Sequence, residues 1–178
     1  SACPGEYEPA VFALRTIGKV GELHYSLSDL KAEDGRVLPA ASLDLRVVRF
    51  SLRLTDYRLR GRTFRNVPEL LDRFFALDLP ANATQPFWLT VHVPPGAQPG
   101  NYSGKVEFIS GETHVDVPLS VTVHPFKLKE PTDRLWALYV DEQRWPARYP
   151  RDDGLLAELH DIREHGIRCL VLAGERDF

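Results

Sequence analysis

Apolar and polar residues alternate along several segments in the first two thirds of the chain. The clearest case is the segment 87–93, in which Phe, Leu and Val alternate with Trp, Thr and His. A period of two predicts a β-strand whose two faces lie in different environments. Pro and Gly residues at 94–100 interrupt this pattern, which resumes at 105–109. Further strands are predicted in the same way at 7–17, 23–29, 43–57 and 113–123.

Turn-forming residues separate these strands. Asp34-Gly35 and Ser110-Gly111 each lie between two apolar segments, and the second pair is a strong hairpin signal. Closely spaced strands with almost no helix are typical of an antiparallel β-sandwich. We therefore predict a mainly β fold with a sandwich over residues 1–128.

Two prolines indicate where individual segments lie. Pro9 comes near the start of the first strand, which suits an edge strand or a strand entry. Pro68 opens the segment 67–71, where the alternation is lost. A short helical turn is expected there, with Pro68 in its first position.

The pattern changes after a polar segment at 129–134, which we expect to be a linker. A continuous apolar run at 135–140 predicts a strand buried on both faces. A helix is expected at 155–163, preceded by an Asp cap and ended by a Gly, and a second buried strand at 167–172. This order predicts one βαβ unit in 135–178. Because a single unit leaves its strand edges unpaired, we expect it to open a larger α/β domain that is cut short.

Composition and charge argue against nucleic-acid binding and membrane association. Of 178 residues, 43% are hydrophobic and 26% charged, as in ordinary globular proteins, and the net charge of −3 gives no reason to expect nucleic acid or an anionic membrane as a partner. The sequence has no apolar run of about 18 residues, so no membrane-inserted helix is predicted. The basic stretch 46–65 interleaves Arg with apolar residues, which favours the solvated face of strands over a phosphate-binding patch. Because the chain starts at Ser1 and lacks Met, we expect a processed or excised piece.

Cys and His residues give no sign of a metal or redox site. Cys3 and Cys169 are too few and too far apart for a disulfide framework, and Cys169 is expected to be a buried, inert thiol. His160 and His165 are five residues apart, which does not bring two imidazoles onto one face of a helix. No phosphate-binding loop or nucleophile elbow is present. We predict no cofactor, no metal and no catalytic residue in this chain.

The order of four motifs resembles the N-terminal β-sandwich of bacterial glycoside-hydrolase-like proteins, which include relatives of glycoside hydrolase family 123 and associated domains of unknown function. The motifs are Gly5-Glu6-Tyr7-Glu8-Pro9, Pro68-Glu69-Leu70-Leu71, Gln85-Pro86-Phe87-Trp88-Leu89-Thr90-Val91, and the Pro-Pro-Gly to Ser-Gly segment 94–104. In that group a (β/α)8 barrel follows the sandwich. The segment 155–172 looks like the first helix and second strand of such a barrel.

The resemblance implies a sugar-active parent enzyme that is secreted or periplasmic. It also implies that the sandwich packs on the remainder of its own barrel and braces it, and that this piece alone is inactive. The family carries an adjacent Asp-Glu pair in its catalytic machinery further along the barrel. Asp141-Glu142 is such a dipeptide, but it follows the first barrel strand, so no catalytic role is transferred to it.

Charged and aromatic residues follow the two C-terminal strands. Barrel active sites gather at the carboxyl ends of the strands, and neighbouring strands lie about 4.8 Å apart. Solvated loop charges or rim salt bridges are the favoured interpretation, and carbohydrate contact and catalysis are the alternatives. The candidate carbohydrate contacts are Asp141, Glu142, Arg144, Trp145 and Glu175.

Two alternatives to the accessory domain stay open. The sandwich itself could bind polysaccharide through exposed aromatic residues, or it could be a structural or adhesion domain without a ligand. Trp88 alternates out of phase with its apolar neighbours and could face away from the core, although a lone Trp in an apolar strand is more often part of the core. Open apolar edges on the strands at 135–140 and 167–172 would favour a truncated α/β domain over both alternatives.

Overall fold

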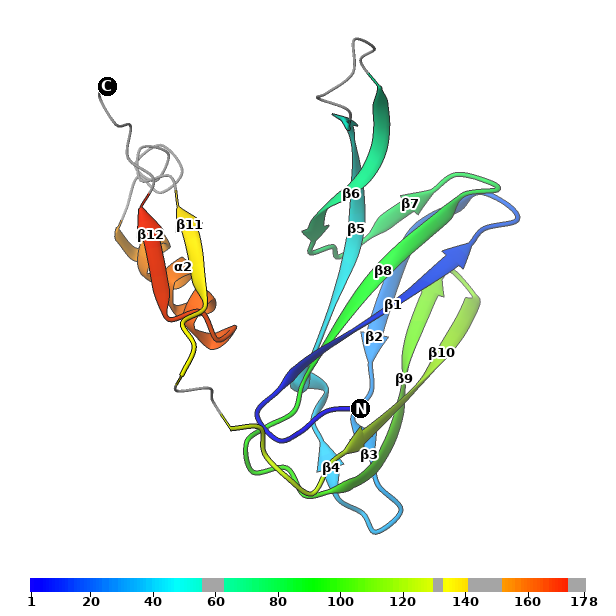
Figure 1. Ribbon diagram of the computed structural model, residues 1–178. Coiled ribbons are helices and arrows are strands. Elements are labelled where there is room, and N and C mark those ends of the chain that lie inside the picture. Colours follow the sequence, from blue (N-terminus) through cyan, green and yellow to red (C-terminus); the bar gives the residue numbers. More distant parts are fainter. Residues whose placement is uncertain (56–62, 130–132, 141–151, 173–178) are drawn as a thin grey trace, which may run out of the picture. The chain divides into compact units, whose positions relative to one another are not determined.

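The computed structural model describes residues 1–55, 63–129, 133–140 and 152–172. The chain divides into two compact units, Ser1–Leu128 and Lys129–Phe178. Strands of the first unit form two antiparallel sheets, and the second unit contains a two-stranded sheet and a helix (Figure 1). The prediction of a mainly β chain with antiparallel sheets is confirmed.

The first sheet has four strands in the order β1-β8-β5-β6. Their bounds are Tyr7–Arg15 for β1, Thr84–His92 for β8, Leu43–Leu54 for β5 and Phe64–Asp72 for β6. The two edge strands each contain a proline, Pro9 in β1 and Pro68 in β6. Since proline cannot donate a ladder hydrogen bond, it is tolerated in an edge strand or where a neighbouring strand has ended, as at Pro86 in β8, beyond the last β5–β8 pair. The edge position expected from Pro9 is confirmed.

The second sheet is built around the long strand β9 (Gly100–Ser110). One side of β9 pairs along its whole length with β10, and this third long edge strand also contains a proline, Pro118. The other side pairs with β2 and β3, and β7 and β4 complete the sheet. The bounds are Thr113–Val123 for β10, Val20–Leu27 for β2, Leu30–Lys31 for β3, Leu77–Leu79 for β7 and Val37–Leu38 for β4; a 3-10 helix, Ala40–Ser42, precedes β5.

The inner faces of both sheets share one hydrophobic core. Aromatic rings join the sheets at its centre: the ring centroids of Phe87 in β8 and Phe108 in β9 are 4.9 Å apart, and those of Phe12 in β1 and Phe108 are 6.0 Å apart. Both Phe87 and Phe108 are fully buried. Aromatic pairs at such distances stabilise a core by about 0.5–1.5 kcal/mol beyond the area that they bury.

The Pro-Gly segment between β8 and β9 has a structural explanation. The buried Tyr102 donates a hydrogen bond from its hydroxyl to the Gln98 carbonyl at 2.8 Å, which fixes the turn on the start of β9. Gly104 faces the chain entering β3: a Cβ atom at this position would lie 2.6 Å from Leu30 Cδ2 and 2.7 Å from the Asp29 carbonyl oxygen. The final glycine of this motif is therefore required by close packing.

The helical turn expected at 67–71 is wrong, because these residues belong to β6. The segment pairs with β5, with a register shift between Arg49 and Phe50 that leaves Glu69 without a directly opposed partner. Such a bulge accommodates Pro68 next to it in an edge strand. Cross-strand pairing thus overrides the local preference of proline for the start of a helix.

The second unit contains the strand, helix and strand that were expected there. These are β11 (Ala137–Val140), α2 (Asp152–Glu164) and β12 (Cys169–Leu172), and β11 pairs with β12 in parallel. Gly166 follows the helix with a φ of 84°, and its backbone N–H donates to the Arg163 carbonyl at 3.0 Å. No helix among the described residues is long and apolar enough to cross a membrane.

Burial of the second unit differs from its prediction. The strand expected to be buried on both faces is exposed, with 62% of Trp136 and 77% of Tyr139 accessible to solvent. Cys169, expected to be buried, is half-buried. The physical reason is that β11 and β12 pair only with each other among the described strands, and α2 is the one helix described beside them.

Candidate functional site

The five residues predicted to contact carbohydrate lie outside the described residues. Asp141, Glu142, Arg144 and Trp145 fall in 141–151, and Glu175 falls in 173–178. Within the described ranges, no group of three or more His, Cys, Asp or Glu side chains could hold a metal ion. The described residues instead present a surface and a cavity.

The apolar side chains of strand β5 move from one face of the sheet to the other in the middle of the strand. In its first half, Leu43, Leu45 and Val47 are buried in the core, and polar residues alternate with them. Val48 follows Val47 directly, so the alternation shifts by one residue. Because neighbouring side chains of a strand point to opposite faces, the apolar residues after Val48 lie on the face that points away from the core.

The shift coincides with the point at which β5 leaves β8. The β5–β8 ladder ends at the pair Val47–Phe87, and the next residue of β8 toward its start is Pro86, which has no N–H to donate. The side-chain amide of Gln85 donates instead to the Val48 carbonyl at 3.0 Å. From here β5 pairs with β6 alone.

We call this two-stranded ribbon, residues 48–54 of β5 and 64–71 of β6, the arm. Figure 1 shows it extending beyond the other strands of its sheet. Apolar side chains are exposed along it, by 65% for Leu52 and 53% for Phe64, and Phe50 and Leu71 are also exposed. Opposed residues share a face, so Val48 with Leu71 and Leu54 with Phe64 extend the same apolar row. We call this row the arm face.

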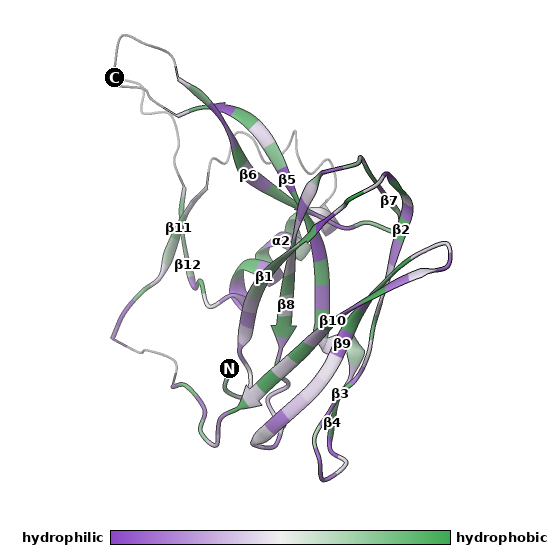
Figure 2. Cartoon of the chain, turned by 90° about the vertical axis from the view of Figure 1, so that its right-hand side faces the viewer, coloured by the Kyte–Doolittle hydropathy of each residue, from purple (hydrophilic) through white to green (hydrophobic). Residues whose placement is uncertain are grey.

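The opposite face of the arm is mixed, with charged pairs beside the exposed Leu70, which opposes Arg49. Arg49 pairs with Asp72 at 3.2 Å, and Arg53 pairs with Glu69. In the first half of β5, Arg46 pairs with Asp44 at 2.7 Å. The basic stretch 46–65 thus has carboxylate partners for these arginines and places them on strands, as its favoured interpretation predicts. Figure 2 shows polar and apolar segments alternating along β5 and β6.

The arm face continues onto the outer face of the four-stranded sheet. Val11, Trp88 and Arg46 lie side by side on three adjacent strands, on the same side as Val48. The Trp88 ring is half-buried and its Nε1–H donates to the Thr90 hydroxyl at 3.2 Å. Trp88 therefore faces away from the core, which is one of the two positions that its alternation with Phe87 and Leu89 left open.

Electrostatic interactions on the sandwich are local. The Arg36 guanidinium beside Asp34 lowers the pKa of that carboxyl, and it also donates to the Pro99 carbonyl at 2.6 Å. Burial, followed by the neighbouring Glu6, raises the pKa of the Cys3 thiol. Both effects belong to turns and chain ends, so they give structural anchors and no poised acid or base.

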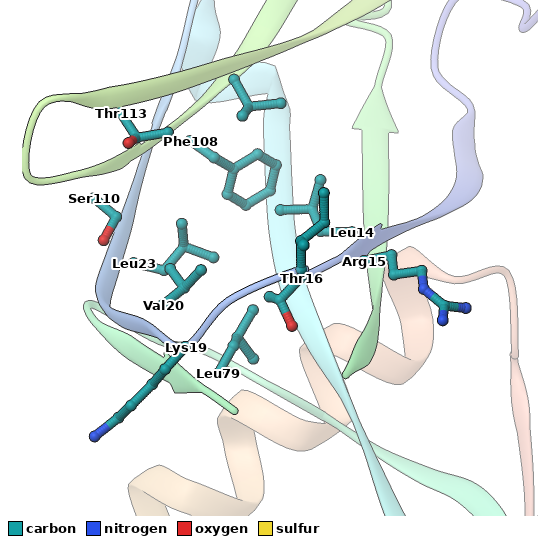
Figure 3. A pocket seen from close by; sticks show the side chains of 12 residues that line it. Leu14, Arg15, Thr16, Lys19, Val20, Leu23, Leu79, Phe108, Ser110 and Thr113 are labelled. Atoms are coloured by element: carbon teal, nitrogen blue, oxygen red, sulfur yellow. The ribbon is translucent and has the colours of Figure 1, made fainter. Parts of the chain in front are cut away.

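A cavity of about 490 Å³ opens between the two sheets at one end of the sandwich, and we call it the end cavity. Figure 3 shows its apolar side chains converging on one hollow from β1, β2, β7 and β9. The apolar lining comprises Leu14, Val20, Leu23, Leu79, Phe108 and Val115, together with Ile17.

The sequence analysis missed the arm as a surface, although its signal is present. The adjacent pair Val47-Val48 breaks a strict alternation on each side of it. A strand that changes phase in this way must bury its two halves against different partners. The end cavity has no comparable signal, because its lining comes from five separate strands.

Comparison with known proteins gives a family and a fold. The family model described as the glycoside hydrolase 123 N-terminal domain matches residues 5–110. A family 123 glycoside hydrolase from Clostridium perfringens, described in work on glycolipid glycan hydrolysis, matches in structure with a TM-score of 0.80 at 17% identity. The match covers 95% of this chain and 32% of that enzyme, so the chain spans about a third of the enzyme's length.

A PapD-like domain of human CEP192 is a much weaker structural match. Its TM-score is 0.38 at 16% identity, and the match covers 72% of this chain and 79% of that domain. No curated protein matches the chain in sequence.

Proposed function

The chain belongs to the glycoside hydrolase 123 N-terminal domain family, and from that premise we propose that it is the accessory sandwich of a glycoside hydrolase, which braces a catalytic barrel and has no activity of its own. The observation that carries this proposal is the change of phase in β5. It places an apolar row on the side of the sheet that the sandwich core does not cover.

The proposed docking surface joins the arm face to the outer sheet face. A two-stranded ribbon is only marginally stable by itself in water, and contiguous exposed apolar side chains are typical of an interaction surface. Phe50, Leu52 and Phe64 together supply aromatic and aliphatic anchors, which are the residue types that bury well against another domain. The catalytic domain of the parent protein is the partner that we propose for this surface.

The second unit supports a longer parent. Both outer edges of its sheet are open among the described strands, and Trp136, Leu138 and Tyr139 are exposed. Free parallel edges with apolar faces are unstable unless further strands and helices cover them. We propose that β11, α2 and β12 are the first βαβ unit of a (β/α)8 barrel, and that Asp141, Glu142, Arg144, Trp145 and Glu175, which follow the two strands in sequence, contact its carbohydrate substrate.

Charge placed on the arm face tests the docking proposal. Leu52→Asp with Phe64→Asp should lower the thermal unfolding temperature of the parent protein by several degrees, since both residues would be buried at the interface. The same variant of the isolated 178-residue chain should unfold within about 0.5 kcal/mol of the unsubstituted chain, because both side chains are exposed there. Ser51→Asp, which adds a charge on the other face of the same strand, is the matched control.

Two outcomes would overturn the proposal. Equal losses of stability in the parent protein and in the isolated chain would show that the arm face contributes only to the sandwich. Turnover of nitrophenyl glycosides by the isolated chain would contradict an accessory role, whatever the arm does. Binding of the isolated chain to insoluble glycans, lost in Trp88→Ala, would favour a carbohydrate-binding module instead.

A further inference from the structure

We propose that the end cavity binds a single aliphatic chain that ends in an anionic head group. This inference does not rest on the accessory function, because the cavity lies between the two sheets of the sandwich and the arm face lies outside them. A volume of about 490 Å³ is in the range of small-molecule sites, which are roughly 300–1,000 Å³.

The interior of the cavity favours an apolar ligand. Leu23, Leu79 and Phe108 form its buried floor. Two of the three hydroxyl groups that border it already have partners: Thr16 Oγ1 donates to the Pro80 carbonyl at 2.6 Å, and Ser110 Oγ donates to the Gly21 carbonyl at 2.6 Å. The third, Thr113, lies at the exposed rim. A cavity with a mainly apolar lining holds water poorly, whereas a hydrocarbon chain gives up no hydrogen bond by entering it.

The mouth of the cavity extends this apolar path to the surface. Ile17 is 90% exposed at the rim, and Val115 on β10 is also exposed. An extended aliphatic chain could therefore remain in contact with apolar side chains from the floor to the mouth. A compact sugar or nucleotide would leave its hydroxyl groups unpaired against the same lining.

The charge at the mouth determines the head group. Arg15 and Lys19 are the charged residues among the twelve that line the cavity, and no carboxylate lines it. Neither cation forms a hydrogen bond or an ion pair with another residue in the described part of the chain. Figure 3 shows both side chains extending from the rim away from the apolar hollow. The cavity thus offers an apolar interior and unpaired positive charge outside it, which matches a carboxylate or phosphate amphiphile.

A chain-length series tests the apolar part of the proposal. Octanoate, decanoate and dodecanoate are titrated into the 178-residue chain by calorimetry, below their micelle concentrations. Affinity should rise about fourfold for each buried methylene and then level off once the cavity is filled. Dodecanol should bind more weakly than dodecanoate. Arg15→Gln with Lys19→Gln should remove that preference and leave dodecanol binding unchanged.

Steric variants locate the binding. Val20→Trp fills the cavity and should abolish binding of dodecanoate; Thr113→Trp at the exposed rim does the same without changing the floor, in case Val20→Trp does not fold. Leu52→Asp with Phe64→Asp on the arm should leave binding unchanged. Binding that survives Thr113→Trp and is lost in the arm variant would overturn the proposal, as would affinities that do not depend on chain length.

A flotation experiment separates two sources of the same ligand chemistry. Co-flotation with phosphatidylglycerol vesicles that Thr113→Trp abolishes would assign the cavity to the chain of a membrane lipid. Dodecanoate binding without co-flotation would assign it to a free amphiphile. Both results uphold an aliphatic anion as the ligand, and absence of binding in both experiments would overturn it.

Discussion

The two halves of strand β5 differ in their pairing partner and in the face on which their apolar side chains lie. Residues 43–47 pair with β8, and their apolar side chains are buried in the sandwich core. Residues 48–54 pair with β6, and their apolar side chains lie on the other face, where Phe50 and Leu52 are exposed. One strand therefore supplies the core of the sandwich and the surface on which the sandwich is proposed to meet a catalytic domain.

This difference teaches that strand formation and burial are separate consequences of a sequence. Both halves alternate with a period of two, and both form a strand. Only the phase of the alternation, which shifts at Val47-Val48, determines which face each half buries. A polar residue in place of Leu43, Leu45 or Val47 would damage folding, whereas one on the arm face should weaken the proposed docking.

The largest expected effect comes from truncating a phenylalanine of the sandwich core, and the same change on the arm gives the comparison. Phe87→Ala removes a fully buried ring from the centre of the core and should lower the free energy of unfolding by about 3–5 kcal/mol. Phe64→Ala on the arm should change it by no more than about 0.5 kcal/mol. Urea unfolding followed by circular dichroism measures both. Similar losses would show that the arm face is buried within the isolated chain.

Adding one methyl group should show how tightly the sandwich packs at β3 and β9. Gly104→Ala places a Cβ against the Leu30 side chain and the Asp29 carbonyl, and should destabilise the sandwich by about 1–3 kcal/mol. Gly18→Ala is the matched control, since no atom lies within 4 Å of its Cβ position. The two variants are compared by thermal unfolding, and a neutral Gly104→Ala would contradict the close approach of β3 to β9.

The junction between the halves should depend on the side-chain amide of Gln85, which donates to the Val48 carbonyl and also to the Pro86 carbonyl at 2.8 Å. Gln85→Met keeps the length of the side chain but removes both donors, at a loss of about 1 kcal/mol for each hydrogen bond. Amide hydrogen exchange should increase along the arm and remain slow in β8. Equally faster exchange in the arm and in β8 would mean that the arm and the rest of the sandwich open together.

The smallest expected effect is the pH dependence of stability that Asp34 and Arg36 give to the sandwich, away from the arm. Hydrogen bonds from Arg36 lower the pKa of Asp34 in the folded chain from its ordinary value of 3.8. The folded carboxyl is the stronger acid, so the stabilisation is complete above that value and is lost as the pH falls through the folded pKa. Thermal unfolding of Asp34→Asn should therefore approach that of the unsubstituted chain toward pH 2. A constant difference from pH 6 to pH 2 would exclude this ion pair as its cause.

The sequence predicted the strands well because their alternation is local. Leu23, Tyr25 and Leu27 identify β2 with no knowledge of its partners, and Ser110-Gly111 identifies the β9–β10 hairpin. Pro68 misled, because its own preference favours a helix start, and only pairing with Phe50 across a bulge makes it part of a strand. The end cavity could not be predicted, since Leu14, Leu79 and Phe108 meet there from three strands far apart in sequence.

Pro9, Pro68 and Pro118 together have a consequence for how this chain behaves in concentrated solution. Each interrupts the row of donors on one of the three long edge strands, β1, β6 and β10. A second copy therefore cannot extend either sandwich sheet by continuous strand addition along these three edges, which disfavours growth into fibrils there. Molecules that associate through their apolar faces should instead form small, reversible clusters that disperse on dilution.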